Sequence, residues 1–461
     1  MTLTEPRVRA TRDGDTAGAL TDATLDTLAA TFAGDATARL MQNAVTQTTV
    51  DDLALNRAVV TTTDNTFSTL LDDWTVTAQK KSGRCWMFAG LNLLRVGARE
   101  KMGLKQFEFS QNYTLFWDKL ERANYFLEAI IETADRDLDD RTVAFLLSGF
   151  SLMSDGGQWN MFVNLIQKHG LVPKSVMPES ESSSNTQRMN SLLRAKLREG
   201  AMQLRERHAA GDSHEALRAA KDKLVAVIYR MLCIHLGTPP TRFTWQWTDR
   251  DGQFHRDEET TPQAFAAKYV TLPVDDYVCL VHDPRPTSPV GRTFTVEYLG
   301  NVVGGTRVKY LNVPIETMKG ITQRTIENGE PVWFGCDVGK QMRRDLGLWD
   351  ARLFDYNGVY GTEFGLNKAQ RLAYGDTQMT HAMLFTGVDS VDGHVRRWRV
   401  ENSWGEENGV KGFFTMNDSW YDEYMFEIAA RAEMLPPDLR AALDEEPIIL
   451  PAWDPMGALA R

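Results

Sequence analysis

The hydrophobic period of the sequence changes near residue 241. Before this point apolar residues recur at the spacing of one helix face, and after it they alternate as in strands. Helices are predicted over residues 22–42, 85–103, 110–132 and 158–169, with a charged helical pair over 185–236. The first of these is interpreted as a peripheral amphipathic arm. The sequence therefore predicts a helical first part and a strand-rich second part.

Two strands near the end of the strand-rich part are predicted to form a hairpin. The segment THAMLFTGVDSVDGHVRRWRVENSWG has two apolar arms around Asp392-Gly393, a dipeptide that favours a tight turn. Because the arms of a hairpin run in opposite directions, their pairing brings His381 and Asn402 to the same end. Further strands are predicted in FTWQWTDRDGQFH, TFTVEYLG, TRVKYLNV and PVWFGCDV.

The charge and the apolar runs of the chain argue against several classes of partner. Its 461 residues carry a formal net charge of −11 that is spread along the sequence, which disfavours binding to nucleic acid or an anionic membrane through the overall field. The first residues lack the apolar core of a secretory signal, and no stretch approaches the roughly 18 apolar residues of a membrane span. We therefore expect a cytoplasmic protein without a membrane partner.

The cysteines and glycine-rich stretches predict neither a metal nor a cofactor. Four scattered cysteines lack CxxC or Cys/His spacing, so neither a disulfide framework nor a zinc site is expected. Three of them lie inside apolar runs and are interpreted as buried thiols: Cys233, Cys279 and Cys336. YLGNVVGGTRV lacks phosphate-loop spacing, and DSVDG lacks the bidentate Glu of a calcium loop.

Cys85 differs from the other cysteines because it lies in the first turn of a predicted helix, in QKKSGRCWMFAG. A thiol attacks a carbonyl as the thiolate, so it requires groups that favour the thiolate and groups that stabilise the resulting oxyanion. A helix N-terminus favours negative charge, and Lys80, Lys81 and Arg84 add positive potential nearby. Cys85 is therefore predicted to be a nucleophile.

Four other residues are predicted to complete a catalytic site. His381 begins an apolar strand and is the best placed of the eight histidines to exchange a proton with the thiol and the leaving amine. Asn402, in ENSWG, can accept from the imidazole N–H and orient the ring, while Trp404 shields that hydrogen bond from water. The side-chain amide of Gln79 and the backbone N–H of Cys85 can bind the oxyanion.

These residues resemble the catalytic set of the papain-like cysteine proteases. Gln79 precedes Cys85 by six residues, GRCW and NSWG surround the cysteine and the asparagine, and Gly156-Gly157 in SDGGQWNM resembles the glycine pair that binds substrate backbone. The resemblance implies an α+β, two-lobed fold. A helical lobe would carry the cysteine, an antiparallel β-barrel-like lobe would carry the histidine and asparagine, and large helical and strand-rich insertions would lie between them.

Two departures from the papain-like pattern identify a narrower group. Ser82 replaces a cysteine that forms a disulfide in secreted members, which fits a reducing compartment. His381 follows Cys85 by 296 residues, against about 130 to 150 in the smaller enzymes. Over about residues 50–461 the chain resembles the bleomycin hydrolase and bacterial aminopeptidase C family. The resemblance rests on this longer separation and on the segments QKKSGRCW, SQNYTLFWDKLERAN and LPAWDPMGALA.

The resemblance implies a division of the chain into five parts. These are an N-terminal arm (1–65), a helical lobe with the nucleophile (66–180), an inserted helical pair and strand-rich, hook-like region (181–325), a β lobe with the histidine and asparagine (326–440), and a C-terminal arm (441–461). In the family this arm enters the active-site cleft, where its carboxylate blocks further subsites and pairs with the substrate amine. Here we expect removal of Arg461, so that Ala460 presents the carboxylate.

The same resemblance implies a cytosolic homohexamer that removes N-terminal residues from peptides with broad side-chain tolerance. The family also hydrolyses the amide of bleomycin. Some members bind nucleic acid, a property that the net charge of −11 does not favour here. Three alternatives stay open: a thiol endopeptidase whose tail does not block the cleft, a non-catalytic or nucleic-acid-binding hexameric scaffold, and acyl transfer to an amine. The sequence does not define the side-chain preference of the substrate pocket or the physiological substrate.

Overall fold

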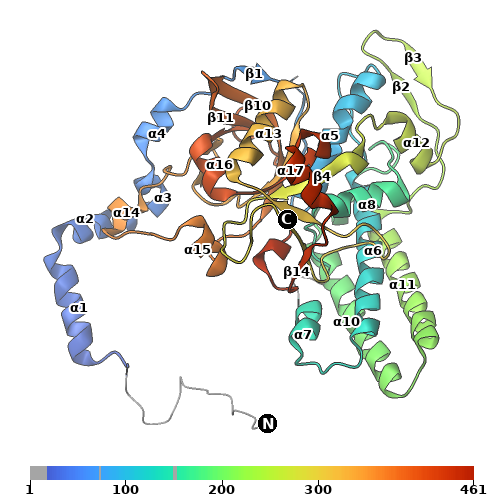
Figure 1. Ribbon diagram of the computed structural model, residues 1–461, viewed down its shortest axis with the longest axis horizontal. Helices are drawn as coiled ribbons and strands as arrows, with labels where there is room; N and C mark the ends of the chain where they lie inside the picture. The colour runs from blue at the N-terminus through green and yellow to red at the C-terminus, as the bar shows by residue number, and fades with distance from the viewer. Residues whose placement is uncertain (1–17, 72–73, 149–152, 461) are drawn as a thin grey trace. The chain divides into compact units, whose positions relative to one another are not determined.

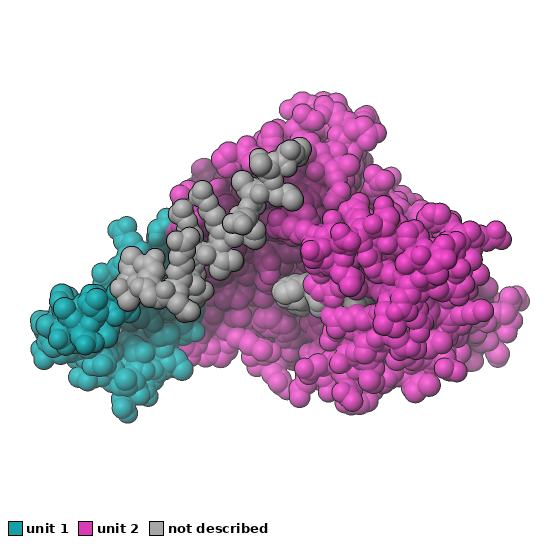
Figure 2. Space-filling view, turned by 90° about the horizontal axis from the view of Figure 1, so that it is seen from below, with its two compact units in different colours: residues 1–58, 352–365 teal, residues 59–351, 366–461 magenta. Residues whose placement is uncertain are grey.

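The computed structural model describes residues 18–71, 74–148 and 153–460 (Figure 1). It forms two compact units (Figure 2). The first contains the N-terminal region up to Ala58 together with Arg352–Gly365, and the second contains Val59–Ala351 and the chain from Leu366 onward. The boundary falls within helix α4 (Arg57–Thr62). The five-part division inferred from the family resemblance stays a prediction.

The first unit is helical. Its helices are α1 (Asp22–Gly34), α2 (Ala36–Val45), α3 (Val50–Ala54) and α14 (Tyr356–Tyr360). The single helix predicted over 22–42 is wrong, because Asp35 leaves the helical conformation and its side chain accepts from the N–H of Ala38 at 2.9 Å, which starts α2. A backbone bridge joins Leu55 to Phe354, a long-range contact that local periodicity does not predict.

The helices of the second unit agree with most of the predicted segments. They are α5 (Cys85–Lys101), α6 (Gln111–Glu132), α7 (Arg141–Leu147), α8 (Trp159–His169), α9 (Glu181–Ser184), α10 (Gln187–Ala209), α11 (His214–Leu236), α12 (Pro262–Tyr269), α13 (Ile315–Glu327), α15 (Lys368–Ala373), α16 (Asp418–Tyr424) and α17 (Pro437–Ala441). The predicted helical pair is α10 and α11, which lie beside α6 (Figure 1). Ser213 caps α11 by accepting from the N–H of Ala216 at 3.2 Å.

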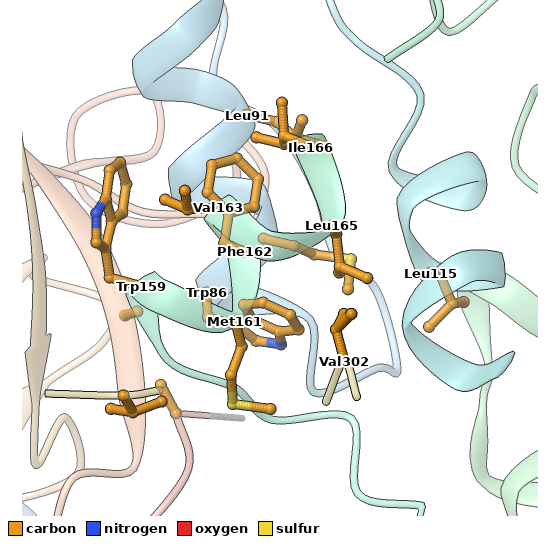
Figure 3. Close-up of a cluster of buried hydrophobic side chains, with 14 of the residues drawn as sticks. Trp86, Leu91, Leu115, Trp159, Met161, Phe162, Val163, Leu165, Ile166 and Val302 are labelled. Carbon is orange, nitrogen blue, oxygen red and sulfur yellow. The ribbon is translucent and has the colours of Figure 1, made fainter. Parts of the chain in front are cut away.

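Buried aromatic and aliphatic side chains fix the position of α5, the helix that begins with Cys85. Figure 3 shows Trp86 and Leu91 of α5 packed against side chains of α8, among them Phe162. A Cβ at Gly90 would lie 2.5 Å from the Phe162 ring, so only glycine allows this approach of the two helices. On the other side the indole N–H of Trp333 donates to the Trp86 carbonyl at 3.0 Å, which ties α5 to the sheet.

The second unit also contains a twelve-stranded sheet and a separate hairpin of β2 (Gln246–Thr248) and β3 (Phe254–Arg256). The sheet order is β14-β5-β6-β4-β13-β7-β10-β11-β12-β9-β8, with β1 beside β10. Its strands are β1 (Thr69–Leu70), β4 (Tyr277–Val281), β5 (Thr293–Val296), β6 (Tyr310–Asn312), β7 (Val332–Cys336), β8 (Met342–Arg343), β9 (Leu348–Trp349), β10 (His381–Val391), β11 (His394–Glu401), β12 (Phe413–Asn417), β13 (Met425–Arg431) and β14 (Ile448–Leu450).

The predicted hairpin is β10 and β11, at the centre of the antiparallel part of this sheet. Asp392 and Gly393 have φ angles of 53° and 79°, as a two-residue turn between right-twisted strands requires. His381 opens β10, and Asn402 follows the end of β11. The fold therefore brings both residues to the same end of the hairpin, as the sequence predicted.

Within the described ranges, no helix has the length and apolar character needed to cross a membrane.

Candidate active site

Cys85 is the first residue of α5, and its side chain is fully buried. Its Sγ accepts a hydrogen bond at 3.4 Å from the backbone N–H of Ala382, the residue after His381. The fold therefore places the predicted nucleophile at the start of β10, although the two segments are 297 residues apart in the chain.

The charged residues before Cys85 contribute less positive potential than the sequence predicted. The guanidinium of Arg84 is buried and donates to both carboxylate oxygens of Glu179 at 3.0 and 2.7 Å, so its charge is compensated. Lys80 and Lys81 are exposed to solvent, which screens their charge. Of these three cations, none supplies an uncompensated buried charge beside the sulfur.

Burial raises the pKa of the Cys85 thiol to about 12, because a thiolate loses its hydration here. The backbone N–H groups of Ala382, Trp86 and Cys85 itself oppose this rise in pKa, and the negative charge of Asp155 adds to it. A lone thiolate is therefore unfavourable at this position, and a nearby cation is required to stabilise it.

His381 and Asn402 form the predicted pair. The Nε2 of His381 lies 3.0 Å from Oδ1 of Asn402, and both side chains are buried. Because Oδ1 can only accept, Nε2 carries the hydrogen and Nδ1 of a neutral ring has the lone pair. The ring of Trp404 lies 5.0 Å from the imidazole, centroid to centroid, at a tilt of 42°. Shielding of the hydrogen bond by Trp404 stays a prediction.

Gln79 connects the loop before Cys85 with the loop after β11. Its Nε2 donates to the carbonyl of Ser82 at 2.5 Å, and its Oε1 accepts from the hydroxyl of Ser403 at 2.6 Å. One N–H of the amide is therefore engaged, and the second is available in principle for an oxyanion. The sequence did not predict these two contacts, and the oxyanion-binding role of Gln79 stays a prediction.

Gly156 and Gly157, which the sequence predicts to bind substrate backbone, make hydrogen bonds within the chain. The N–H of Gly157 donates to the carbonyl of Ala460 at 3.0 Å in an antiparallel bridge, and Nε2 of Gln158 donates to the carbonyl of Ala458 at 2.7 Å. Gly156 donates to Ser154 and accepts from Arg122. Ala460 is fully buried in this contact, while Arg461 lies outside the described residues.

A cavity lies beside the C-terminal arm. It is bordered by Arg122 and Ser154 on one side and by arm residues from Ala452 to Leu459 on another. Gln378, three residues before His381, also lines it. The C-terminal arm thus forms one wall of a cavity beside the glycine pair.

Asp155 is a contributor that the sequence analysis missed. Its carboxylate accepts from the backbone N–H of Gly83 at 3.1 Å and from Asn190 at 2.6 Å, and it pairs with Lys119 at 2.7 Å. Burial alone would raise the pKa of Asp155, but the charge of Lys119 and the hydrogen bonds hold it well below its usual range. The carboxylate therefore joins the loop before Cys85 to the loop of Gly156. An acidic residue directly before two glycines was the available signal.

Glu401, directly before Asn402, is the second missed contributor. Its carboxylate accepts from Trp74 at 2.5 Å, from Asn92 at 2.9 Å and from Arg95 at 2.7 Å. Asn92 and Arg95 belong to α5, the helix of Cys85. A buried ion pair therefore holds the nucleophile helix against the strand that leads to Asn402.

Among the described residues, no group of three or more His, Cys, Asp or Glu side chains is arranged to hold a metal ion. The cysteines at 233, 279 and 336 are free thiols.

Comparison with known proteins assigns the chain to a family. The family model described as Peptidase C1-like matches residues 19–457. Bleomycin hydrolase from Gallus gallus is 44% identical, with 92% of this chain and 94% of the relative aligned. Aminopeptidase C from Lactobacillus delbrueckii subsp. lactis is 44% identical, with 86% and 89% aligned.

A solved structure supports the same assignment. The crystal structure of PepW from Lactobacillus rhamnosis superposes with a TM-score of 0.94 at 44% identity, over 96% of this chain and 100% of that one. These matches confirm the predicted papain-like, α+β fold. The chain belongs to the Peptidase C1-like family.

Proposed function

We propose that this chain is a cysteine aminopeptidase that removes N-terminal residues from peptides through an acyl-enzyme on Cys85. Relatives named aminopeptidase C and bleomycin hydrolase support the activity. The observation that carries the proposal is the backbone bridge between Gly157 and Ala460. In this proposal Gly157 binds substrate backbone, so the arm that already bonds to it blocks longer peptides and favours peptides that begin near the thiol.

The proposed reaction begins with proton transfer from Sγ of Cys85 to Nδ1 of His381. The resulting imidazolium supplies the cation that the buried sulfur requires. The sulfur then bonds to the carbonyl carbon of the first peptide bond, and the carbonyl electron pair moves to the oxygen. The Gln79 amide and the Cys85 backbone N–H bind this oxyanion. Asn402 holds the ring in the orientation that both transfers need.

Collapse of the oxyanion breaks the C–N bond. His381 gives its proton to the leaving nitrogen, so that the shortened peptide leaves as a neutral amine. A water molecule then gives a proton to His381 and its oxygen attacks the thioester. The thiol leaves with that proton, and the first residue is released as a free amino acid.

Selection of free N-termini is proposed to depend on a carboxylate at Ala460, exposed when Arg461 is removed. Two unit charges about 4 Å apart attract by roughly 4 kcal/mol at an effective dielectric of 20, before desolvation is subtracted. The bond from Gly157 to the Ala460 carbonyl supports this position. Mass spectrometry of the purified protein measures whether the last residue is lost in the active enzyme and kept in Cys85→Ala.

Turnover of one peptide with a free and an N-acetylated terminus tests the main proposal. We expect cleavage of the free peptide by one residue at a time, no cleavage of the acetylated peptide, and no turnover by Cys85→Ala. Preferred cleavage of the acetylated peptide would instead indicate an endopeptidase. A folded chain that neither turns over peptides nor reacts with iodoacetamide at Cys85 would be a scaffold.

We further propose that the protein is a cytoplasmic homohexamer with broad side-chain tolerance, and that the five-part division of the chain applies. The family resemblance supports these statements. Light scattering on purified protein tests the hexamer, for which a mass of six chains is expected. A monomer with full aminopeptidase activity would contradict it.

A further inference from the structure

The last ten described residues of the C-terminal arm, 451–460, form a segment that we call the plug. Their sequence, PAWDPMGALA, contains one charged residue, Asp454. Its carboxylate receives two hydrogen bonds from the guanidinium of Arg285, from Nη1 at 3.1 Å and from Nη2 at 2.8 Å. Only 11% of the Arg285 side chain and 12% of the Asp454 side chain is exposed. A bidentate pair of this kind is both strong and specific in direction.

Arg285 is itself held in place before it meets the plug. Asp283 accepts from its Nε at 3.0 Å and from its Nη2 at 2.7 Å. Asp283 is fixed in turn by the Ser288 hydroxyl at 2.6 Å and by Asn312, whose Oδ1 accepts from the Asp283 N–H at 2.9 Å. The guanidinium therefore has one orientation, and little conformational entropy is lost when Asp454 binds to it.

The Arg285–Asp454 pair lies between the last strand of the arm and the contacts that the plug makes with Gln158 and Gly157. Before it, β14 pairs with β5 as far as Leu450. After it, the plug reaches Gln158 through the Ala458 carbonyl and Gly157 through the Ala460 carbonyl. Asp454 also accepts from the N–H of Met456 at 2.9 Å, which caps the short 3-10 turn at Pro455–Gly457. The ion pair thus fixes the start of the plug in space and sets the direction in which the chain continues from β14 toward Gly157.

We propose that Arg285 is a positioning residue that keeps the enzyme an aminopeptidase by holding Asp454, and through it the plug, against Gly157. This inference rests on the proposed function and names the contact that sets its specificity. Without the pair, the plug detaches from Gly157, and the freed N–H binds the backbone of peptides that extend beyond the thiol on the acyl side. Peptides with a blocked N-terminus then become substrates.

Asp454→Ala is the variant that tests this proposal with least disturbance, because Arg285 keeps its partner Asp283. The measured quantity is the ratio of kcat/KM for an N-acetylated peptide to kcat/KM for the same peptide with a free amine. In the wild type this ratio should lie at the detection limit, and in Asp454→Ala we expect it to lie at least about tenfold above that limit, as when a largely buried, hydrogen-bonded charge pair is broken. Arg285→Met should raise the ratio in the same direction.

Glu445→Ala is the matched control. Glu445 also lies in the C-terminal arm and pairs with an arginine, Arg292, at 3.1 Å, but about half of each side chain is exposed, so its loss should leave the ratio unchanged. Deuterium exchange of residues 451–460 gives a readout independent of activity, and it should speed up in Asp454→Ala and not in Glu445→Ala.

Unchanged exchange of the plug in Asp454→Ala would overturn the proposal, and so would faster exchange with an unchanged substrate ratio. Failure of the proposed function has a different signature. The wild type would then not cleave a peptide with a free amine, whereas the exchange measurement would still show whether the pair holds the plug.

Discussion

Glu401→Gln tests how strongly the fold depends on the ion pair between the nucleophile helix and β11. The Arg95 and Glu401 side chains are 5% and 1% exposed, and Nη2 lies 2.7 Å from Oε1. Glutamine keeps the size of the side chain and one acceptor oxygen, but it leaves the Arg95 charge without a compensating charge. Breaking a buried pair in this way costs about 3–5 kcal/mol of unfolding free energy.

Arg95→Met removes the positive charge of the same ion pair, and its effect on the free energy of unfolding depends on pH. Burial raises the pKa of Glu401, and the charge of Arg95 opposes that rise. Without the arginine, the buried carboxyl can take up a proton, whereas a guanidinium in Glu401→Gln cannot lose one. An acid with a raised folded-state pKa destabilises the fold above that pKa and ceases to do so below its unfolded value, about 4.3.

Urea denaturation at pH 7 and at pH 5 measures both effects. The free-energy loss in Glu401→Gln should not decrease at pH 5, because the wild-type carboxyl, whose pKa burial raises, is penalised less at the lower pH and glutamine does not titrate. The loss in Arg95→Met should be smaller at pH 5 than at pH 7. The double variant should lose less than the sum of the single losses, since neither charge is left alone. Glu445→Gln, with its exposed partner, should change stability by less than about 0.5 kcal/mol. A loss below about 1 kcal/mol in Glu401→Gln would refute the reasoning.

Three further predictions concern other sites. In Gly157→Ala the new Cβ would lie 2.5 Å from the Trp86 ring, so steady-state kinetics should show kcat/KM reduced by about tenfold or more through displacement of the glycine loop. Asp155→Ala leaves the Lys119 ammonium buried without its partner, and urea titration should show a loss of about 3–5 kcal/mol. Burial lowers the pKa of His282 from 6.5 to about 4. Between these two pH values the imidazole is protonated in the unfolded chain and neutral in the folded one, so the free energy of unfolding should fall as pH decreases from 6.5 to about 4. His282→Gln should reduce this fall.

Local patterns predicted most of the framework that positions the site. The helices at 111–132 and 214–236 begin at Ser110 and Ser213, whose hydroxyls accept from the backbone three residues later. The β10–β11 hairpin follows from an Asp-Gly pair between alternating strands. Such signals depend on neighbouring residues, so a single sequence contains them.

The contacts that lock the site together could not be predicted in the same way. Arg95 and Glu401 are 306 residues apart, and Arg285 and Asp454 are 169 apart. Their pairing depends on how the sheet and helices assemble, and a buried charge looks the same in sequence as an exposed one. The division of the 22–42 segment by Asp35 was missed for a related reason, since aspartate is compatible with both a helix surface and a cap.

The surroundings of Cys85 show that an exposed basic sequence before a cysteine is weak evidence for a reactive thiol. Arg84 is neutralised by Glu179, the lysines face water, and burial favours the protonated sulfur. Backbone N–H groups oppose this effect only in part. In the proposed mechanism the cation that stabilises the thiolate is the imidazolium at the start of β10, whose ring nitrogen Nε2 lies 3.0 Å from Oδ1 of Asn402. In the proposed mechanism His381 therefore controls ionisation of the sulfur, which makes the packing of α5 against β10 a condition for the proposed reactivity.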